Sequence, residues 1–333
     1  MTALFDPSKF KQGNPMRAFA PLATLALAVL CLPALCSAQE VFPSRPITVI
    51  VPFQPGQGVD IMARALTVEL SRITGQAFPV INRDGAAATV GFAALAAARP
   101  DGYTIAISPN TPLTVAPHLL KSVTYTYDAF IPVCQIFENV MAVFVGAGSP
   151  HKTLKELLAA GQAQPDKFNW ATTGVGSVPH LSGAALLQAA KVAATHVPFR
   201  GEPQILQQLM ANEIAFAAAS VSGMAGKSVR ALAVFSEQRH TAFPEVPTMA
   251  ELGFPPGVPG LNGMFAPRGT PEPVLAVLEK ACADATASEG FRTAAGRLHQ
   301  RVAYLGRRDF DRRLRNDYEE KAKLIRALNL KPE

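Results

Sequence analysis

The chain has 333 residues, of which 49% are hydrophobic, 17% charged and 8% aromatic. Glycine and proline together make up 52 residues, a share that excludes a collagen repeat and a disordered proline- and glycine-rich tract. The formal net charge of +6 falls to +4 once residues 1–38 are set aside, since these carry three basic residues and one acidic one. No recognisable nucleic-acid motif accompanies this charge, so we expect no nucleic-acid partner.

The first 38 residues have the pattern of an export signal. Basic residues precede an apolar run over residues 18–35, and Cys36-Ser37-Ala38 supplies the small residues of a signal-peptidase site. A membrane anchor is the alternative, because the run reaches the lower limit of a membrane-spanning helix. Two prolines inside the run and the small residues after it favour cleavage. We therefore expect a soluble, periplasmic chain of 295 residues that begins at Gln39.

Strands and helices alternate along the rest of the chain. The β-branched run 47–51 predicts a buried strand, and Asp60 is expected to cap a helix that ends at Gly75. Further strands are expected near 78–81, 103–108, 170, 196–198, 214–219 and 230–235, with an extended run over 131–146. Further helices are expected over 91–98, 153–162, 180–191 and 203–211, and from Pro271 and Asp309 onward. This alternation predicts an α/β fold with mainly parallel sheets, built as two α/β sets.

Two cysteines, Cys134 and Cys282, remain after removal of the signal. They could form one disulfide in an oxidising compartment. Their settings, an apolar run and a helical pattern, favour two separately buried thiols instead. The chain has no CxxC or HExxH spacing that would indicate zinc, and we expect no metal or cofactor.

Two glycine-containing loops could cradle an anion. One is Pro55-Gly56-Gln57-Gly58-Val59-Asp60 after the first strand, and the other is Thr172 to Ser177. Glycines allow backbone N–H groups to approach a ligand, and a helix N-terminus favours negative charge. For either loop alone, a tight turn that needs glycine is the better interpretation. For the two loops together, a carboxylate-binding site and a pair of tight turns explain the glycines equally well.

Catalytic motifs are weak by comparison. The chain lacks a complete dinucleotide fingerprint, a phosphate-binding GxxxxGK[ST] loop and a GxSxG nucleophile elbow. Ser177 and His180 are three residues apart at a helix start, which is poor geometry for a catalytic triad. A triad could still assemble from residues distant in the sequence, but no local motif supports one, and we expect a protein that is not an enzyme.

Several segments, in order, resemble the Bug family, the TctC-like extracytoplasmic solute receptors of tripartite tricarboxylate transporters. They span essentially all of residues 43–330 and are 43–47, 51–60, 82–83, 100–104, 174–181, 196–201, 230–234, 244–248 and 266–271. The resemblance implies a type II periplasmic-binding-protein fold, in which two α/β lobes close on a ligand between them. It also implies that lobe 1 comprises residues 39–137 and 263–333, and that lobe 2 comprises residues 138–262.

The resemblance further implies which residues contact a ligand carboxylate. In lobe 1 they are Phe53, Gly56, Gly58 and Asp60 in the first loop, with Ser108 and Asn110 after the third strand. In lobe 2 they are Thr173, Gly174, Ser177, His180, Arg200 and Gly201. Asp60 is expected to cap its helix rather than to contact the anion directly.

Departures from the family pattern narrow the expected ligand. Val59 stands where the family usually has threonine, and Ala218 to Ser222 lacks the acidic or asparagine-containing turn common there. No acid is placed to receive an ammonium group, so we expect a small organic carboxylate without an amine. The expected partners are that acid and the permease subunits of a tripartite tricarboxylate transporter, with the receptor acting as a monomer. A sensory module for a membrane receptor kinase and a secreted hydrolase are the alternatives.

Overall fold

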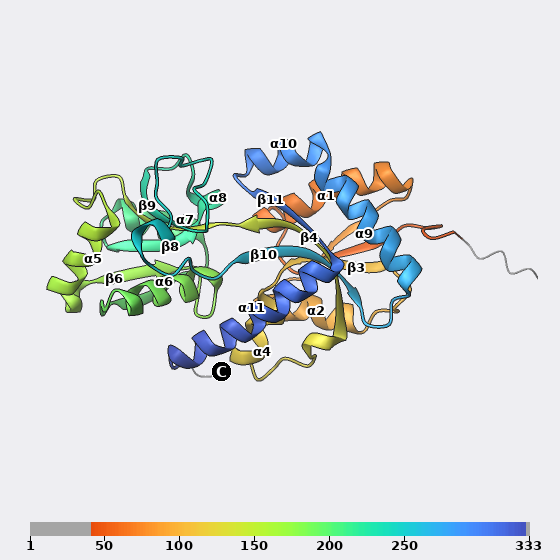
Figure 1. Ribbon diagram of the computed structural model, residues 1–333, viewed down its shortest axis with the longest axis horizontal. Helices are drawn as coiled ribbons and strands as arrows, with labels where there is room; N and C mark the ends of the chain where they lie inside the picture. Colours follow the sequence, from red (N-terminus) through yellow and green to blue (C-terminus); the bar gives the residue numbers. More distant parts are fainter. Residues whose placement is uncertain (1–40, 331–333) are drawn as a thin grey trace, which may run out of the picture. The chain divides into compact units, whose positions relative to one another are not determined.

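The computed structural model describes residues 41–330, and the export signal expected at residues 1–38 lies outside them. These residues form two β-sheets with helices on both faces of each (Figure 1). Within the described residues, no helix is both long enough and apolar enough to cross a membrane.

The first sheet has six strands in the order β11-β4-β10-β3-β1-β2. Their bounds are β1 Thr48–Val51, β2 Val80–Asn82, β3 Thr104–Pro109, β4 Phe130–Asn139, β10 Gly260–Pro267 and β11 Arg301–Gly306. β1 pairs in parallel with β2 and β3, whereas β10 and β11 pair antiparallel with β4. The carboxyl ends of β1, β2 and β3 therefore lie along one edge, where ligands collect in open α/β sheets.

Alternate side chains of this sheet enter two separate cores. Val49 and Val51 pack with the helices α1 (Gly58–Thr74), α9 (Glu272–Ala287) and α10 (Glu289–Arg297). Ile50 points to the opposite face, toward α2 (Thr89–Ala96) and α11 (Arg307–Ala327). This alternation is what the β-branched run predicts for a strand buried on both faces. The short helices α3 (Thr111–Thr114) and α4 (Ala116–Leu119) follow β3.

The second sheet has five strands in the order β7-β6-β8-β5-β9. Their bounds are β5 Met141–Gly146, β6 Asn169–Thr172, β7 Thr195–Pro198, β8 Phe216–Ser220 and β9 Val229–Phe235. Val143 and Val145 pack with α5 (Leu154–Ala163) and α6 (Val178–Ala189), while Phe144 packs with α7 (Glu202–Met210) and α8 (Val221–Met224). Each sheet with its helices forms one lobe. Both sheets combine parallel and antiparallel pairs, so the expectation of mainly parallel sheets is wrong: the two passages between the sheets bring β4, β5, β9 and β10 back antiparallel to their neighbours.

The chain passes between the sheets twice. The run expected to be one extended segment is two strands, β4 and β5, which are separated by Val140 and belong to different sheets. The return passage leads from β9 to β10, whose first residue, Gly260, pairs with Asn139 at the end of β4. Both passages therefore lie beside each other, and Figure 1 shows β4 and β10 running together through the first lobe.

The C-terminal part contains a strand that the sequence pattern does not reveal. β11 lies at the edge of the first sheet and is only partly buried, so it lacks a continuous apolar signal. It is followed directly by α11, which begins at Arg307, two residues before the expected Asp309. Between residues 41 and 330, four single turns of 3₁₀ helix complete the elements, at Ala86–Ala88, Tyr127–Ala129, Pro165–Lys167 and Ala250–Leu252.

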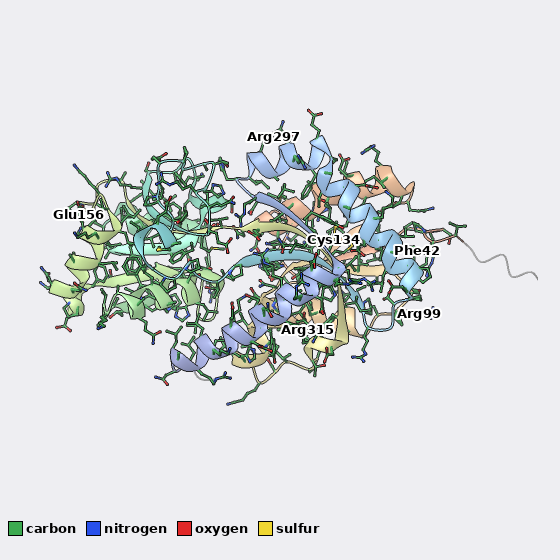
Figure 2. All side chains as sticks on the ribbon, viewed as in Figure 1. Phe42, Arg99, Cys134, Glu156, Arg297 and Arg315 are labelled. Atoms are coloured by element: carbon green, nitrogen blue, oxygen red, sulfur yellow. A yellow bond between two sulfur atoms is a disulfide. The ribbon has the colours of Figure 1, made fainter. Side chains whose placement is uncertain are left out.

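The expectation of two separate thiols is wrong. Cys134 of β4 and Cys282 of α9 form a disulfide, with Cα atoms 6.7 Å apart. Both residues are fully buried in the same core, and Figure 2 shows Cys134 inside the first lobe. The apolar and helical settings that suggested separate thiols belong to one packed face, because α9 lies directly on β4. Charged residues such as Arg99 and Arg297 lie at the surface of the same lobe (Figure 2).

Candidate ligand-binding site

The first expected loop joins β1 to α1 and is open to solvent. Gly56 and Gly58 are exposed, and Phe53 is half-buried against the core beneath them. α1 begins at Gly58, and its N-cap residue Gln57 makes no side-chain capping hydrogen bond. The first-turn N–H groups of a helix have no acceptor within the helix, so this turn offers donors and a positive dipole end to an anion.

Asp60 does not cap α1, contrary to the sequence expectation. It is the third residue of the helix and is 2% exposed. Its Oδ2 accepts a hydrogen bond from the Gly56 N–H at 2.9 Å, and its Oδ1 accepts one from Asn82 Nδ2 at 2.8 Å. The helix begins at Gly58, two residues before Asp60, so Asp60 lies in its first turn. From there the Asp60 carboxylate reaches back to the Gly56 N–H and holds Gly56 in a positive-φ conformation.

A small network fixes the charge of Asp60. Burial acts to raise its pKa, but hydrogen bonds from Arg64, Asn82 and Gly56 outweigh burial and leave the pKa below its ordinary value. Arg64 Nε lies 3.0 Å from Asp60 Oδ2, and Asn82 also donates to the Phe53 carbonyl at 2.8 Å. The negative charge at the helix N-terminus is therefore matched by Arg64 and does not act unopposed on an incoming anion.

The loop after β2 carries an unusual backbone. Ala86, Ala87 and Ala88 all have positive φ, between 45° and 73°, where L-residues are disfavoured. This turn brings α2 against the first loop: a Cβ on Gly91 would lie 2.6 Å from Pro52 Cβ. The loops after β1 and β2 therefore form one packed unit.

Ser108 and Asn110 lie at the end of β3 but are fully buried. Ser108 Oγ donates to the Pro109 carbonyl at 2.9 Å. Asn110 Nδ2 donates to Asp317 of α11 at 2.7 Å, and its N–H donates to Leu261 of β10. Asp317 in turn pairs with the fully buried Lys321 at 2.8 Å. Asn110 thus connects the end of β3 to α11 and β10, whereas the Ser108 hydroxyl bonds within its own strand, and the Asn110 Oδ1 atom has no partner.

The second expected loop, between β6 and α6, is held by its own side chains. Ser177 caps α6 by accepting from the His180 N–H, and its Oγ donates to the Gly174 carbonyl at 2.7 Å. The Gly176 N–H donates to His180 Nδ1 at 3.1 Å, so this N–H is not free for a ligand. Thr173 and Gly174 are half-buried at the mouth of the loop.

His180 belongs to an aromatic cluster beneath that loop. It stacks on Trp170 with ring centroids 5.6 Å apart and lies 4.3 Å from the His196 ring. Burial lowers the pKa of His180, and burial together with the neighbouring His180 lowers the pKa of His196 to about 4. His196 Nε2 and Thr172 Oγ1 share a hydrogen bond at 2.8 Å. Both histidines therefore stay neutral at pH 7 and support the loop.

The third group in the second lobe follows β7. Arg200 is exposed and Gly201 is the N-cap of α7. The first residue of α7, Glu202, accepts hydrogen bonds from the Ser220 N–H at 2.9 Å and from Ser220 Oγ at 2.5 Å. Burial raises the pKa of Glu202, although the bonds from Ser220 oppose this. Glu202 thus ties the Arg200 loop to the end of β8.

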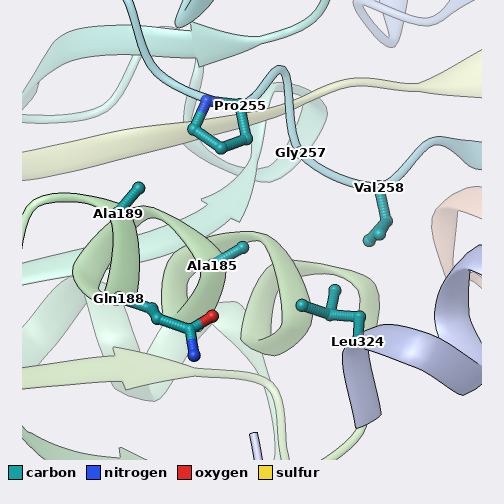
Figure 3. A pocket seen from close by; sticks show the side chains of 7 residues that line it. All are labelled: Ala185, Gln188, Ala189, Pro255, Gly257, Val258 and Leu324. Carbon is teal, nitrogen blue, oxygen red and sulfur yellow. The ribbon is translucent and has the colours of Figure 1, made fainter. Parts of the chain in front are cut away.

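Most of the twelve expected residues take part in hydrogen bonds within their own lobe, and the hydrogen bonds described above do not join one lobe's loops to the other's. Two hollows in the surface lie elsewhere. The larger one, of about 310 Å³, separates α6 from the return passage and α11 (Figure 3). Its lining is almost entirely apolar, with Gln188 as the one side chain that carries an amide. This apolar hollow supplies nothing to balance a carboxylate, so the loops at the strand ends are a better candidate site than the larger hollow.

Sequence reasoning missed several residues that shape these loops. Asn82 and Arg64 hold Asp60, Glu202 holds Ser220, and Gln300 lies beside Gly58. Asn82 and Arg64 had a detectable signal, since they lie at a strand end and one helical turn after Asp60. Gln300 had none, because it comes from a loop more than 240 residues further along the chain.

Two α/β lobes, two crossing passages and loops gathered at the strand ends define a two-lobed binding-protein fold. A family model described as the tripartite tricarboxylate transporter family receptor (TctC) matches residues 62–330. The chain therefore belongs to this family, as the resemblance of its motifs indicated, and it is a solute-binding protein of the TctC and Bug type.

Individual relatives agree with this assignment. The UPF0065 protein in the tcbD-tcbE intergenic region of Pseudomonas sp. strain P51 is 37% identical, over 83% of this chain and 86% of its own. Among solved structures, the periplasmic binding protein BugD is 27% identical with a TM-score of 0.75, covering 88% of this chain and all of BugD. MatC from Rhodopseudomonas palustris, solved with bound malate, is 29% identical with a TM-score of 0.72, covering 85% of this chain and all of MatC. The predicted two-lobed fold is confirmed.

Proposed function

We propose that this protein is exported to the periplasm, binds a small organic carboxylate without an amine between its lobes, and delivers it to a tripartite tricarboxylate-type permease. The observation that carries the proposal is the open N-terminus of α1 at the edge of the first sheet, in a chain of the receptor family. We expect it to act as a monomer, without a cofactor and without catalysis.

Lobe 1, residues 39–137 and 263–333, would supply the primary anion contact. The free N–H groups around Gly58 and the dipole of the 17-residue helix α1 favour a carboxylate there. Phe53 and Gly56 would shape the loop, and Asp60, neutralised by Arg64, would hold it. Ser108 and Asn110, which are buried at the end of β3, would support the site from below through their hydrogen bonds to Pro109 and Asp317.

Lobe 2, residues 138–262, would close over the ligand. Thr173 and Gly174 lie in the loop between β6 and α6, and Ser177 caps α6. Arg200 and Gly201 directly precede α7. The exposed Arg200 guanidinium would add positive charge to a ligand that carries more than one carboxylate. A ligand that contacts both lobes would bind the closed state more tightly than the open one, and binding would therefore shift the protein toward the closed state.

Two features support a carboxylate that lacks an amine. MatC, a relative of similar fold, carries malate. In this chain the acid nearest the end of β8, Glu202, already accepts two hydrogen bonds from Ser220, and its other oxygen lies against Gly223. An ammonium group would therefore find no free carboxylate at this turn.

Uptake measurements in a deletion strain test delivery. Loss of this protein should abolish uptake of one labelled carboxylate, as should loss of the permease, and the wild-type gene should restore it. If uptake persists but ligand-induced gene expression disappears, the protein serves a sensory receptor and the transport proposal is wrong.

A further inference from the structure

Gln300 lies beside the N-terminus of α1, although it is distant in sequence. It follows α10 and precedes β11, and its own N–H donates to the Ala295 carbonyl at 2.9 Å. Its side chain extends toward the first residue of α1: Nε2 lies 3.9 Å from the position that a Cβ on Gly58 would occupy.

The side-chain oxygen of Gln300 is buried but accepts no hydrogen bond. The residue is 8% exposed, and its Oε1 atom is buried without any hydrogen-bond partner. A buried acceptor left unpaired is unfavourable, and such groups in native proteins are usually satisfied by a water, an ion or a ligand. The neighbouring Arg301 pairs with Glu138 on β4 through Nη2, and its buried Nε also has no hydrogen-bond partner, so it does not donate to Gln300 Oε1.

The local geometry therefore combines three features at one point. Gly58 leaves space in front of the helix, the first turn of α1 offers N–H donors, and the amide of Gln300 offers an NH₂ donor group and an acceptor oxygen. A plain carboxylate can use only donors. A carboxylate with a hydroxyl on the adjacent carbon can use the acceptor as well, since its O–H donates.

We propose that Gln300 contacts the ligand and selects 2-hydroxycarboxylates, with its Nε2 donating to the carboxylate held at α1 and its Oε1 accepting from the adjacent hydroxyl. This assignment rests on the proposed function, because it takes the N-terminus of α1 as the carboxylate site. The terminal amide turns over a broad range about its last side-chain bond, which lets both atoms reach one ligand.

Calorimetric titration with matched acid pairs tests the assignment. The pairs are malate with succinate, lactate with propionate, and mandelate with phenylacetate, each differing by one hydroxyl. The wild type should bind the hydroxy acid of its preferred pair about tenfold more tightly, the effect of one well-placed hydrogen bond. Gln300→Met, which keeps the length but removes both polar atoms, should bind the two acids of that pair within about twofold of each other.

A charge change provides the second variant and its control. Gln300→Glu should weaken both acids of the pair by tenfold or more, because it places a negative charge beside the carboxylate. Gln76→Glu makes the same change beyond the opposite end of α1, about 25 Å away for a helix of this length, and should leave binding unchanged. The melting temperature of ligand-free Gln300→Met should not fall below that of the wild type, because the side chain gives up no hydrogen bond to the protein, and this separates a ligand contact from a structural role.

The outcomes distinguish this assignment from the proposed function. If the wild type binds a hydroxy acid and Gln300→Met keeps the same preference, or if the wild type binds both acids of the pair equally, the role of Gln300 is wrong and the function stands. If the wild type binds none of the six acids, the result counts against the carboxylate function itself.

Discussion

Asp60 and His180, two of the predicted site residues, stabilise the candidate ligand-binding loops through buried side chains. Asp60 restrains Gly56 at one loop, and His180 accepts the Gly176 N–H at another. The sequence identified both residues as part of the site, but their side chains support the loops through buried hydrogen bonds. Pattern and spacing locate a residue near a strand end, yet they do not say which way its side chain turns. That depends on partners such as Asn82, which only the fold brings close.

Strain in the turn after β2 leads to a first prediction. Ala87 has φ 53° and ψ 42°, a conformation that costs an L-residue about 1–2 kcal/mol and glycine much less. Ala87→Gly should raise the free energy of unfolding by about 0.5–1 kcal/mol, after the larger chain entropy of glycine is subtracted. Ala94→Gly, in the middle of α2, should lower it by about 1 kcal/mol. Urea denaturation checks both, and equal destabilisation by the two changes would contradict the argument.

The His196 ring predicts a pH dependence of stability. Its pKa is about 4 in the folded protein against an ordinary 6.5, so below pH 6.5 the unfolded chain takes up a proton that the folded one refuses. The contribution of neutral His196 to the free energy of unfolding is therefore full above pH 6.5 and is lost as the pH falls toward 4. His196→Gln should flatten the decline in that range, as measured by urea denaturation at several pH values. A curve parallel to that of the wild type would show that His196 does not titrate in this way.

At the level of secondary structure, most elements follow from periodicity and capping. The β-branched run of β1 and the serine cap of α6 are readable because burial and hydrogen bonding there are local. β11 and the break at Val140 are not, because each depends on which sheet the strand joins. The Cys134–Cys282 bond was missed for the same reason, since it needs the docking of α9 on β4.

The junction between α7 and β8 gives a third prediction. Glu202 accepts both the N–H and the Oγ–H of Ser220, and burial raises its pKa above the ordinary 4.5. Folding therefore becomes less favourable as pH rises from 4.5 to the raised pKa, because the unfolded chain loses its proton first. Glu202→Gln keeps an acceptor oxygen without the charge, so it should match or exceed the wild-type stability at pH 7.5.

The contrasting variant at this junction is Glu202→Ala. It leaves the Ser220 N–H without its acceptor and should cost about 1–3 kcal/mol, measured by the same denaturation experiment. Similar losses in the alanine and glutamine variants would mean that the charge of Glu202, rather than its acceptor oxygen, stabilises the junction.

At the level of the whole molecule, two adjacent chain passages join the lobes. Both passages lie between the two cysteines of the disulfide in the sequence. Cys134 and Cys282 are 148 residues apart, so the loop that they close contains all of the second sheet. Both cysteines nevertheless lie in the core of the first lobe. The bond therefore cross-links two elements of the first lobe and does not tie that lobe to the second.

Removal of this bond gives a fourth prediction. The double variant Cys134→Ala and Cys282→Ala should lose about 2–5 kcal/mol of folding stability, because the unfolded chain is no longer cross-linked. Reducing agent should destabilise the wild type in thermal denaturation and leave the double variant unaffected. Ligand affinity should not change in the double variant. A loss of affinity without a loss of stability would place the bond in lobe closure instead.

The central claim is that a carboxylate binds at the loops where the strands of the two lobes end. Its most direct test is calorimetric titration of protein freed of any ligand by unfolding and refolding, with carboxylates and amino acids as titrants. We predict saturable one-to-one binding of a carboxylate, no binding of amino acids, and at least a tenfold loss in the charge-reversal variant Arg200→Glu. Tight binding of an amino acid, with no binding of simple carboxylates, would contradict the account.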